Sequence, residues 1–94
     1  MPRGVILVDY TDQGRRTIKD SPDRAEASKA EAAKLGVHVK DLFYTPGGPH
    51  DAAMIIEAEG PESINKLMAS VQSLGNVKMK FIRAFSIEGM RKMV

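Results

Sequence analysis

The chain has 94 residues, no cysteine, and 14 basic against 12 acidic side chains, which leaves a net charge of +2. These values exclude disulfides and thiolate zinc sites, and they predict one small domain, residues 1–94, whose thin core gains stability by association. No apolar run approaches the roughly 20 residues of a membrane span and no long block of like charges is present, so a soluble cytoplasmic protein is expected.

The chain is expected to open with a strand that is followed by helical segments. Residues 5–11 (VILVDYT) are rich in β-branched side chains and end in turn residues, which predicts a strand. The apolar first half of this strand lacks alternation, so both of its faces should be covered. A short helical turn, weakened by Gly14, is expected over residues 12–19.

A longer helix is expected between Ser21 and Gly36. Serine is a favoured N-cap residue, and glycine commonly follows a helix end. The side chains expected to face inward are mostly alanine: Ala25 and Ala32, together with Leu35. This helix should therefore lie close to whatever it covers.

Two further strands, residues 37–45 and 51–59, are expected to form a hairpin. They are joined by an irregular loop, TPGGPH, over residues 45–50. Regular alternation along the first of these strands places four side chains on one face: Val37, Val39, Asp41 and Phe43.

The second half of the chain again contains a helix followed by a strand. The clearest helical period is formed by four apolar side chains: Ile64, Leu67, Met68 and Val71. The helix starts at a Gly-Pro pair and ends at Gly75. Residues 77–85 (VKMKFIRAF) predict a fourth strand, and Ser86 caps a short C-terminal helix whose Met90 and Met93 are interpreted as core or subunit contacts.

The resulting order, β-α-β-β-α-β with a terminal helix, predicts a ferredoxin-like α+β fold. Such a fold has a four-stranded antiparallel sheet in the order 4-1-3-2, with both helices on one face. The other face would be bare, yet strands one, three and four carry apolar side chains at both alternating positions. A monomer does not tolerate an apolar patch of that size, so we expect a second copy to cover it in a homodimer or larger homo-oligomer.

Residues 10–27 (YTDQGRRTIKDSPDRAEA), 34–45 (KLGVHVKDLFYT) and 73–85 (SLGNVKMKFIRAF) together resemble the GYD-domain family. That family is similar to the dimeric α+β-barrel superfamily. The resemblance implies a sheet that dimerises face to face, often within larger assemblies, and it implies no established activity. The Gly-Tyr-Asp stretch that names the family is replaced here by Pro49-His50-Asp51, so any role of the tyrosine does not carry over.

The expected topology brings distant residues together at one edge of the sheet, where strands one and two end and strands three and four begin. The catalytic candidates are His50 and Asp51, because a carboxylate can orient an imidazole that acts as a general base. The ligand-binding candidates at this edge are Asp9, Tyr10, Tyr44 and Lys78. A phenol or the ammonium of Lys78 could stabilise a developing oxyanion.

Each of these residues also has a simpler interpretation. A histidine in a loop of glycine and proline is commonly a solvated turn residue, and Asp51 can satisfy loop amides. Asp9 can serve a helix cap or a turn. His38 is expected at the opposite edge, which leaves His50 without a second imidazole and disfavours a metal site. Neither a metal nor a cofactor is expected.

Arg83 is a further ligand-binding candidate, and it lies on the fourth strand. The topology places Glu57 among its neighbours. Two roles for Arg83 are open: an ion pair with this glutamate at a subunit interface, or the binding of an anion by its guanidinium group.

Two functions from different classes follow from these observations. The first is a homo-oligomeric small-molecule-binding protein, with a cofactor-free isomerase or oxygenase activity as its enzymatic form. The alternative is a non-catalytic assembly or regulatory module, favoured by the apolar second face and the lack of a strong catalytic motif. RNA binding is disfavoured because strand three has no aromatic side chains for base stacking, so neither nucleic acid nor membrane is an expected partner.

Overall fold

The order of strands and helices in the structure, a computed structural model that describes residues 2–94, matches the order expected from the sequence. The elements are β1 (Arg3–Tyr10), α1 (Asp12–Arg16), the 3-10 helix η1 (Ile18–Asp20), α2 (Ser21–Lys34), β2 (Val37–Tyr44), β3 (Ala52–Ala58), α3 (Pro61–Gln72), β4 (Val77–Arg83) and α4 (Ile87–Met93). The strand ends differ from the expected ones by at most two residues.

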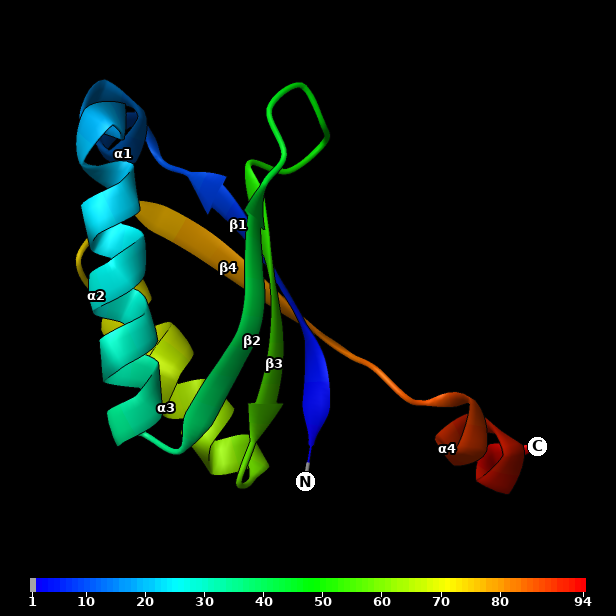
Figure 1. Cartoon of the computed structure of the whole chain (residues 1–94). Coiled ribbons are helices and arrows are strands. Elements are labelled where there is room, and N and C mark those ends of the chain that lie inside the picture. Colours follow the sequence, from blue (N-terminus) through cyan, green and yellow to red (C-terminus); the bar gives the residue numbers. More distant parts are fainter. Residues whose placement is uncertain (1) are drawn as a thin grey trace.

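The strands form one antiparallel sheet in the order β2-β3-β1-β4, which confirms the ferredoxin-like topology. At the centre of the sheet, Ile6 of β1 is aligned with Met54 of β3 and with Phe81 of β4. Helices α2 and α3 both lie on one face and leave the other face without helices (Figure 1). The fold therefore has two layers, with its core between the helices and the sheet.

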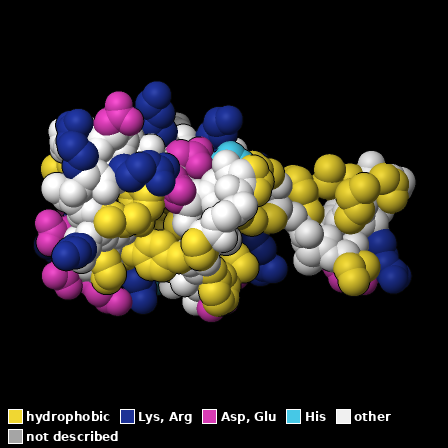
Figure 2. Space-filling model, turned by 90° about the horizontal axis from the view of Figure 1, so that it is seen from above, with side chains coloured by type: hydrophobic (Ala, Val, Ile, Leu, Met, Phe, Trp, Pro, Cys, Tyr) yellow, Lys and Arg dark blue, Asp and Glu magenta, His cyan; other side chains and the backbone are white. Residues whose placement is uncertain are grey.

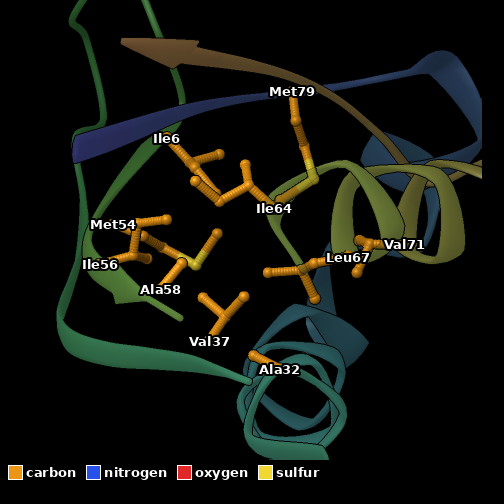
Figure 3. Packing of buried hydrophobic residues seen from close by; sticks show 10 residues of the cluster. All are labelled: Ile6, Ala32, Val37, Met54, Ile56, Ala58, Ile64, Leu67, Val71 and Met79. Carbon is orange, nitrogen blue, oxygen red and sulfur yellow. The ribbon is translucent and has the colours of Figure 1, made fainter. Parts of the chain in front are cut away.

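The core is built from alternate residues of the strands and from the periodic face of α3 (Figure 3). Its largest fully buried residues, each 0–1% exposed, are Ile6, Ile56, Val37 and Leu67. Leu67 belongs to the period that predicted α3, and that prediction is confirmed. The contribution of α2 to the buried cluster is small, since Ala32 is its only fully buried apolar residue among those described.

Strand β2 contains an irregularity that changes which of its side chains face the core. Its pairing with β3 shifts between Val39 and Asp41, so Lys40 is an extra residue in β2. An extra residue reverses the alternation of the strand beyond it. Val39 and Leu42 therefore both pack against the core, whereas Phe43 is 56% exposed. The expectation that Asp41 and Phe43 share a face with Val39 is wrong.

The face of the sheet opposite the helices, here called the bare face, is apolar at its centre and charged at its margin. The pairing of the strands places these apolar side chains on it: Val5, Leu7, Phe43, Ala53, Ile55 and Ile82. Ile55 and Ile82 are 43% and 51% exposed. At the margin, Glu57 is paired with Arg3 at 3.2 Å and with Lys40 at 3.8 Å.

The C-terminal segment stands away from the rest of the chain (Figures 1 and 2). We call residues 84–94 the C-terminal arm. Ser86 caps α4 as expected, because its hydroxyl accepts a hydrogen bond from the N–H of Gly89 at 3.0 Å. The large apolar side chains of the arm are all exposed by half or more: Phe85, Ile87, Met90, Met93 and Val94. None of the helices within residues 2–94 has both the length and the apolar character that crossing a membrane requires.

Candidate functional site

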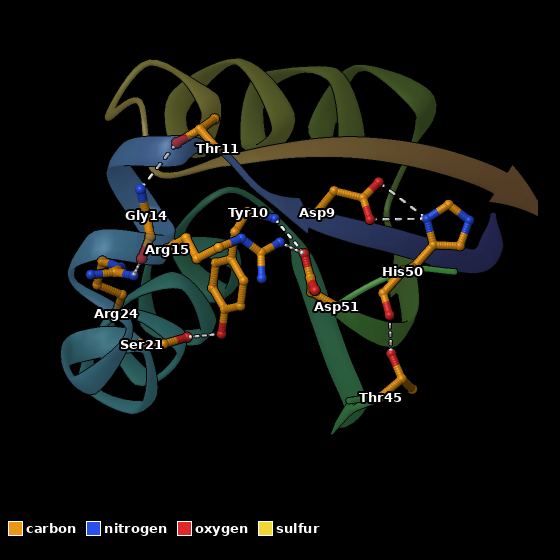
Figure 4. Close-up of polar contacts among 10 residues, drawn as sticks. All are labelled: Asp9, Tyr10, Thr11, Gly14, Arg15, Ser21, Arg24, Thr45, His50 and Asp51. Atoms are coloured by element: carbon orange, nitrogen blue, oxygen red, sulfur yellow. Dashed lines mark hydrogen bonds and ion pairs between the residues drawn. The ribbon is translucent and has the colours of Figure 1, made fainter. Parts of the chain in front are cut away.

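Two polar clusters lie at the end of the sheet where β1 and β2 finish and β3 begins (Figure 4). Successive side chains of a strand point to opposite faces, so the neighbours Asp9 and Tyr10 enter different clusters. Asp9 contacts His50 on the bare face, whereas Tyr10 contacts Ser21 on the helix-covered face. The predicted edge does bring these residues together, but the sheet divides them into two sites.

His50 is held by a carboxylate, and that carboxylate is Asp9. Its Nδ1 lies 3.1 Å from each carboxylate oxygen, and the side chains of His50 and Asp9 are 29% and 35% exposed. An ionised carboxylate only accepts hydrogen bonds, so in the neutral ring Nδ1 carries the hydrogen and Nε2 keeps a free lone pair. A lone pair at Nε2 can accept a proton from a group placed beside it, which is the task of a general base.

The loop before β3 is closed by its own hydrogen bonds, and this closure positions His50. The Thr45 hydroxyl donates to the carbonyl of His50 at 2.6 Å, and the N–H of Thr45 donates to the carbonyl of Asp51 at 2.9 Å. A turn between Thr45 and Gly48 is closed at 3.0 Å. Gly47 has φ +84°, a conformation that other residues rarely adopt. The glycine and proline residues therefore form a fixed turn that presents the imidazole to β1.

Asp51 takes partners on the helix-covered side. Its Oδ2 accepts the backbone N–H of Tyr10 at 2.8 Å and a guanidinium N–H of Arg15 at 3.3 Å. Its own backbone N–H donates to the carbonyl of Val8 at 3.0 Å. Asp51 therefore joins the start of β3 to the end of β1 and to α1. This geometry fits the interpretation of a group that satisfies backbone amides better than that of a catalytic partner of His50.

Ser21 joins two tyrosines in a cluster of hydroxyl groups that the sequence did not reveal. Its Oγ lies 2.8 Å from the hydroxyl of Tyr10 and 3.1 Å from that of Tyr44. The prediction that Ser21 caps α2 is wrong: the residue is the first of the helix, only 8% exposed, and Asp20 stands at the cap position without a side-chain bond. The inward stripe of α2, extended back by four residues from Ala25, would have placed Ser21 inside.

The two remaining candidates lie far from each other. Lys78 is exposed and is aligned with Asp9 across the β1–β4 pair, so it belongs to the end of the sheet that holds both clusters. Arg83 is aligned with Gly4 at the other end, and its guanidinium carbon lies 5.3 Å from the ring centre of Phe85. The structure therefore does not bring Arg83 to the site. Within one chain, Glu57 is paired with Arg3 and Lys40, and an ion pair of Arg83 with Glu57 across a subunit interface stays a prediction.

His38 lies at the opposite end of the sheet from His50, as expected, because it is aligned with Glu57 near the end of β3. In the part of the chain that the structure describes, no three histidine, aspartate or glutamate side chains are grouped so that they could hold a metal ion. The side chains of the Asp9–His50 pair can themselves transfer a proton and form hydrogen bonds.

Comparison with known proteins places the sequence in a family. The sequence pattern of the GYD domain matches residues 5–94. The chain belongs to the GYD-domain family. A relative of this GYD domain from Thermus thermophilus, 30% identical over 88 residues, is named "Glutamine synthetase and cystathionine beta-lyase binding protein". That match covers 93% of this chain and 92% of the relative.

The fold of this GYD domain also has a solved counterpart. The crystal structure of TTHA0845, likewise from Thermus thermophilus, matches with a TM-score of 0.57 at 19% sequence identity. The match covers 92% of this chain and 95% of the other. At that identity the likeness shows the arrangement of strands and helices alone.

The stretch Pro49-His50-Asp51 of this GYD domain stands where the family is expected to carry its Gly-Tyr-Asp. In this chain Asp51 accepts a hydrogen bond from the Tyr10 amide. His50, at the position where the resemblance implies a tyrosine, forms the pair with Asp9. The role of His50 therefore has to be argued from its own contacts, and family membership does not supply it.

Proposed function

We propose that this protein is a homo-oligomeric regulatory module that binds other proteins, metabolic enzymes in particular, and acts without catalysis of its own. The Thermus relative supports this proposal, since its name describes the binding of two enzymes and it aligns over nearly the whole chain. The expectation of a cytoplasmic location belongs to the same proposal. The observation that carries the proposal of a homo-oligomeric module is the exposed apolar centre of the bare face.

A second copy of the chain is the occupant that best fits the bare face. The apolar centre is complementary to itself, and the paired charges of Glu57, Arg3 and Lys40 stand at its margin, where they stay solvated in a face-to-face dimer. Burying Ile55 and Ile82 against the same residues of a second sheet removes apolar area at about 25 cal/mol per Å².

The size of the sheet argues that the C-terminal arm takes part in the same contact. Strands at a spacing of about 4.8 Å, with about seven residues at ~3.3 Å each, offer a face of roughly 19 by 23 Å. Two such faces bury about 900 Å², below the ~1,200 Å² at which stable specific interfaces begin. The apolar side chains of the arm can supply the difference by packing on the second copy.

Self-association is tested by sedimentation equilibrium on the wild-type protein and two variants. Ile55→Lys places a charge at the centre of the bare face, and it should shift the protein to monomers at concentrations where the wild type is a dimer or larger. Ile18→Lys is the matched control, because Ile18 is 48% exposed but lies in η1, away from the sheet. A wild-type protein that stays monomeric at high micromolar concentration contradicts the proposal.

Partner binding is tested separately with purified glutamine synthetase and cystathionine beta-lyase from the host of this protein. Surface-immobilised protein should retain at least one of the two enzymes and should not retain an unrelated enzyme of similar size. Binding that persists in Ile55→Lys would place the enzyme contact outside the self-association surface. Failure of both enzymes to bind the intact oligomer would overturn the assignment of these partners.

The Asp9–His50 pair supports a second candidate, the binding of a small molecule with a proton-transfer reaction such as isomerisation. The pair lies on the bare face, so a second copy on that face would enclose it and exclude water from Nε2. Native mass spectrometry of protein purified from its host tests this candidate. A ligand that co-purifies with the wild type and with His38→Ala, but not with His50→Ala, is the expected result. A ligand retained equally by His50→Ala removes His50 from the site.

A further inference from the structure

A cavity of about 420 Å³ lies on the helix-covered side of the sheet, opposite the Asp9–His50 pair. It is open to solvent and is bordered by three parts of the fold: the N-terminal half of α2, the C-terminal end of α3, and the ends of the strands. This volume falls in the range of pockets that hold small organic ligands. Figure 2 looks onto this end of the molecule and shows an exposed hydrophobic area bordered by charged side chains.

The cavity exists because the inward stripe of α2 is made of small side chains. Ser21, Ala25 and Ser28 line it, and only Ala32, one turn further, is fully buried against the core. The expectation that this helix lies close to what it covers is therefore wrong for its first half. The helix is held at its far end by the core and at its start by the hydroxyl cluster, and the short side chains between leave the space open.

The walls of the cavity are mainly apolar. The sheet and α3 contribute these side chains: Val8, Leu42, Met54, Val71, Val77 and Met79. Apolar walls favour a ligand whose transfer out of water is favourable in free energy, such as an aromatic or short aliphatic compound.

The hydroxyl cluster supplies the polar contact. Three hydroxyl groups, those of Tyr10, Ser21 and Tyr44, make two hydrogen bonds with one another, and each bond uses one hydrogen. One O–H hydrogen is therefore left to donate elsewhere. Tyr44 is the most exposed of the three, at 44%, so its hydroxyl is the one that a ligand reaches most easily.

The charged groups around the cavity do not favour an ionic ligand. The guanidinium of Arg24 already donates to the carbonyls of Thr17 and Gly14, and the carboxylate of Asp51 faces Arg15. Glu31 adds negative charge to the wall, which repels an anion.

We propose that this cavity binds a small uncharged organic molecule, mainly apolar and with one hydrogen-bond acceptor such as a carbonyl oxygen. The acceptor atom accepts a hydrogen bond from the remaining O–H of the hydroxyl cluster, and the apolar part of the molecule fills the space beside Ala25 and Leu42. This site is independent of self-association through the bare face, because it lies on the other side of the sheet.

The proposal is tested by NMR titration of the uniformly ¹⁵N,¹³C-labelled full chain with three probes. Acetophenone has the carbonyl, ethylbenzene has the same carbon skeleton without the oxygen, and benzoate carries a negative charge. Acetophenone should shift the methyl signals of Ala25 and Leu42. It should bind about 3- to 10-fold more tightly than ethylbenzene, the difference that one hydrogen bond makes. Benzoate should bind at least about 10-fold more weakly than acetophenone.

Variants locate the binding and separate its two parts. Ala25→Leu fills the cavity and should weaken acetophenone binding about 10-fold or more, whereas Ala30→Leu, on the exposed side of α2, should leave it unchanged. Tyr44→Phe should reduce the preference for acetophenone over ethylbenzene. If Ala25→Leu unfolds the chain, Ser28→Leu replaces it.

Three results would overturn the proposal. They are a folded wild-type protein that binds neither neutral probe up to the limit of solubility, equal binding by Ala25→Leu and the wild type, and acetophenone affinity that falls as the protein concentration rises. The last result would show that the arm or another part of a second copy occupies the cavity.

Discussion

Asp9 and His50, which are 41 residues apart in the sequence, form a pair in which both carboxylate oxygens lie 3.1 Å from Nδ1 of the imidazole. The pair fixes the ring in one orientation and leaves Nε2 directed away from the carboxylate (Figure 4). Because the carboxylate cannot donate a hydrogen bond, it also selects the tautomer of the neutral ring.

The first prediction is therefore a tautomer. Long-range ¹H–¹⁵N correlation spectra of the protein, recorded at a pH where the imidazole is neutral, should show the hydrogen of His50 on Nδ1. The exposed His38 serves as an internal reference, since it lies at the other end of the sheet. Asp9→Ala should remove the preference of His50 and leave His38 unchanged. A His50 spectrum that does not respond to Asp9→Ala would show that the pair does not form in solution.

The hydroxyl cluster leads to a prediction about stability. Ser21→Ala removes the shared partner of Tyr10 and Tyr44, and Ser21 is only 8% exposed. We expect the free energy of unfolding to fall by about 1 kcal/mol, the low end for a lost buried partner, because both phenols keep some access to water. Urea unfolding followed by circular dichroism measures it. Ser28→Ala, in the same stripe of α2, is the control and should change stability by less than about 0.5 kcal/mol.

The sequence predicted the fold well because the order of strands and helices leaves few topologies open. It could not predict the extra residue in β2, since Lys40 and Asp41 are both polar and either could have continued the alternation. That single residue moves Leu42 into the core and Phe43 onto the bare face. The face that each side chain of β2 occupies beyond Lys40 is determined by the pairing with β3, which is a long-range property of the chain.

The sequence predicted which residues meet at one end of the sheet, but not that the sheet divides them between its two faces. The topology correctly brought Asp9, Tyr10, Tyr44 and His50 to one end of the sheet. The alternation of β1 would have separated Asp9 from Tyr10, because neighbouring residues of a strand point to opposite faces. Ser21 was not predicted to belong to the site because a serine before a proline is typical of a helix N-cap. Its contact with the tyrosines also depends on how α1 and η1 turn the chain, which is not visible in the sequence.

The close approach between α1 and Asn76, the residue before β4, predicts that adding one methyl group at Gly14 strongly lowers the free energy of unfolding. A Cβ atom on Gly14 would overlap the carbonyl oxygen of Asn76, and that oxygen also accepts the N–H of Thr11 at 3.1 Å. The backbone at Asn76 must move to accommodate Gly14→Ala, so the variant should lose about 3 kcal/mol in unfolding free energy. Gly60→Ala is the control, because a Cβ there has no atom within 4 Å. Equal unfolding midpoints for the two variants would contradict the packing of α1 described here.

The C-terminal arm leads to the last prediction, which separates a helix supported by a second copy from one that stands alone. Helix α4 has seven residues, and isolated helices shorter than about 12–15 residues are marginal in water. The amide of Met90, which donates to the carbonyl of Ser86 at 2.9 Å, should therefore exchange slowly with deuterium only where copies associate. Its protection should rise with protein concentration and should be lost in Ile55→Lys. Met90→Gln should weaken self-association, whereas Lys92→Gln on the same helix should not. Exchange at α4 that is fast at every concentration would mean that the arm packs on no second copy.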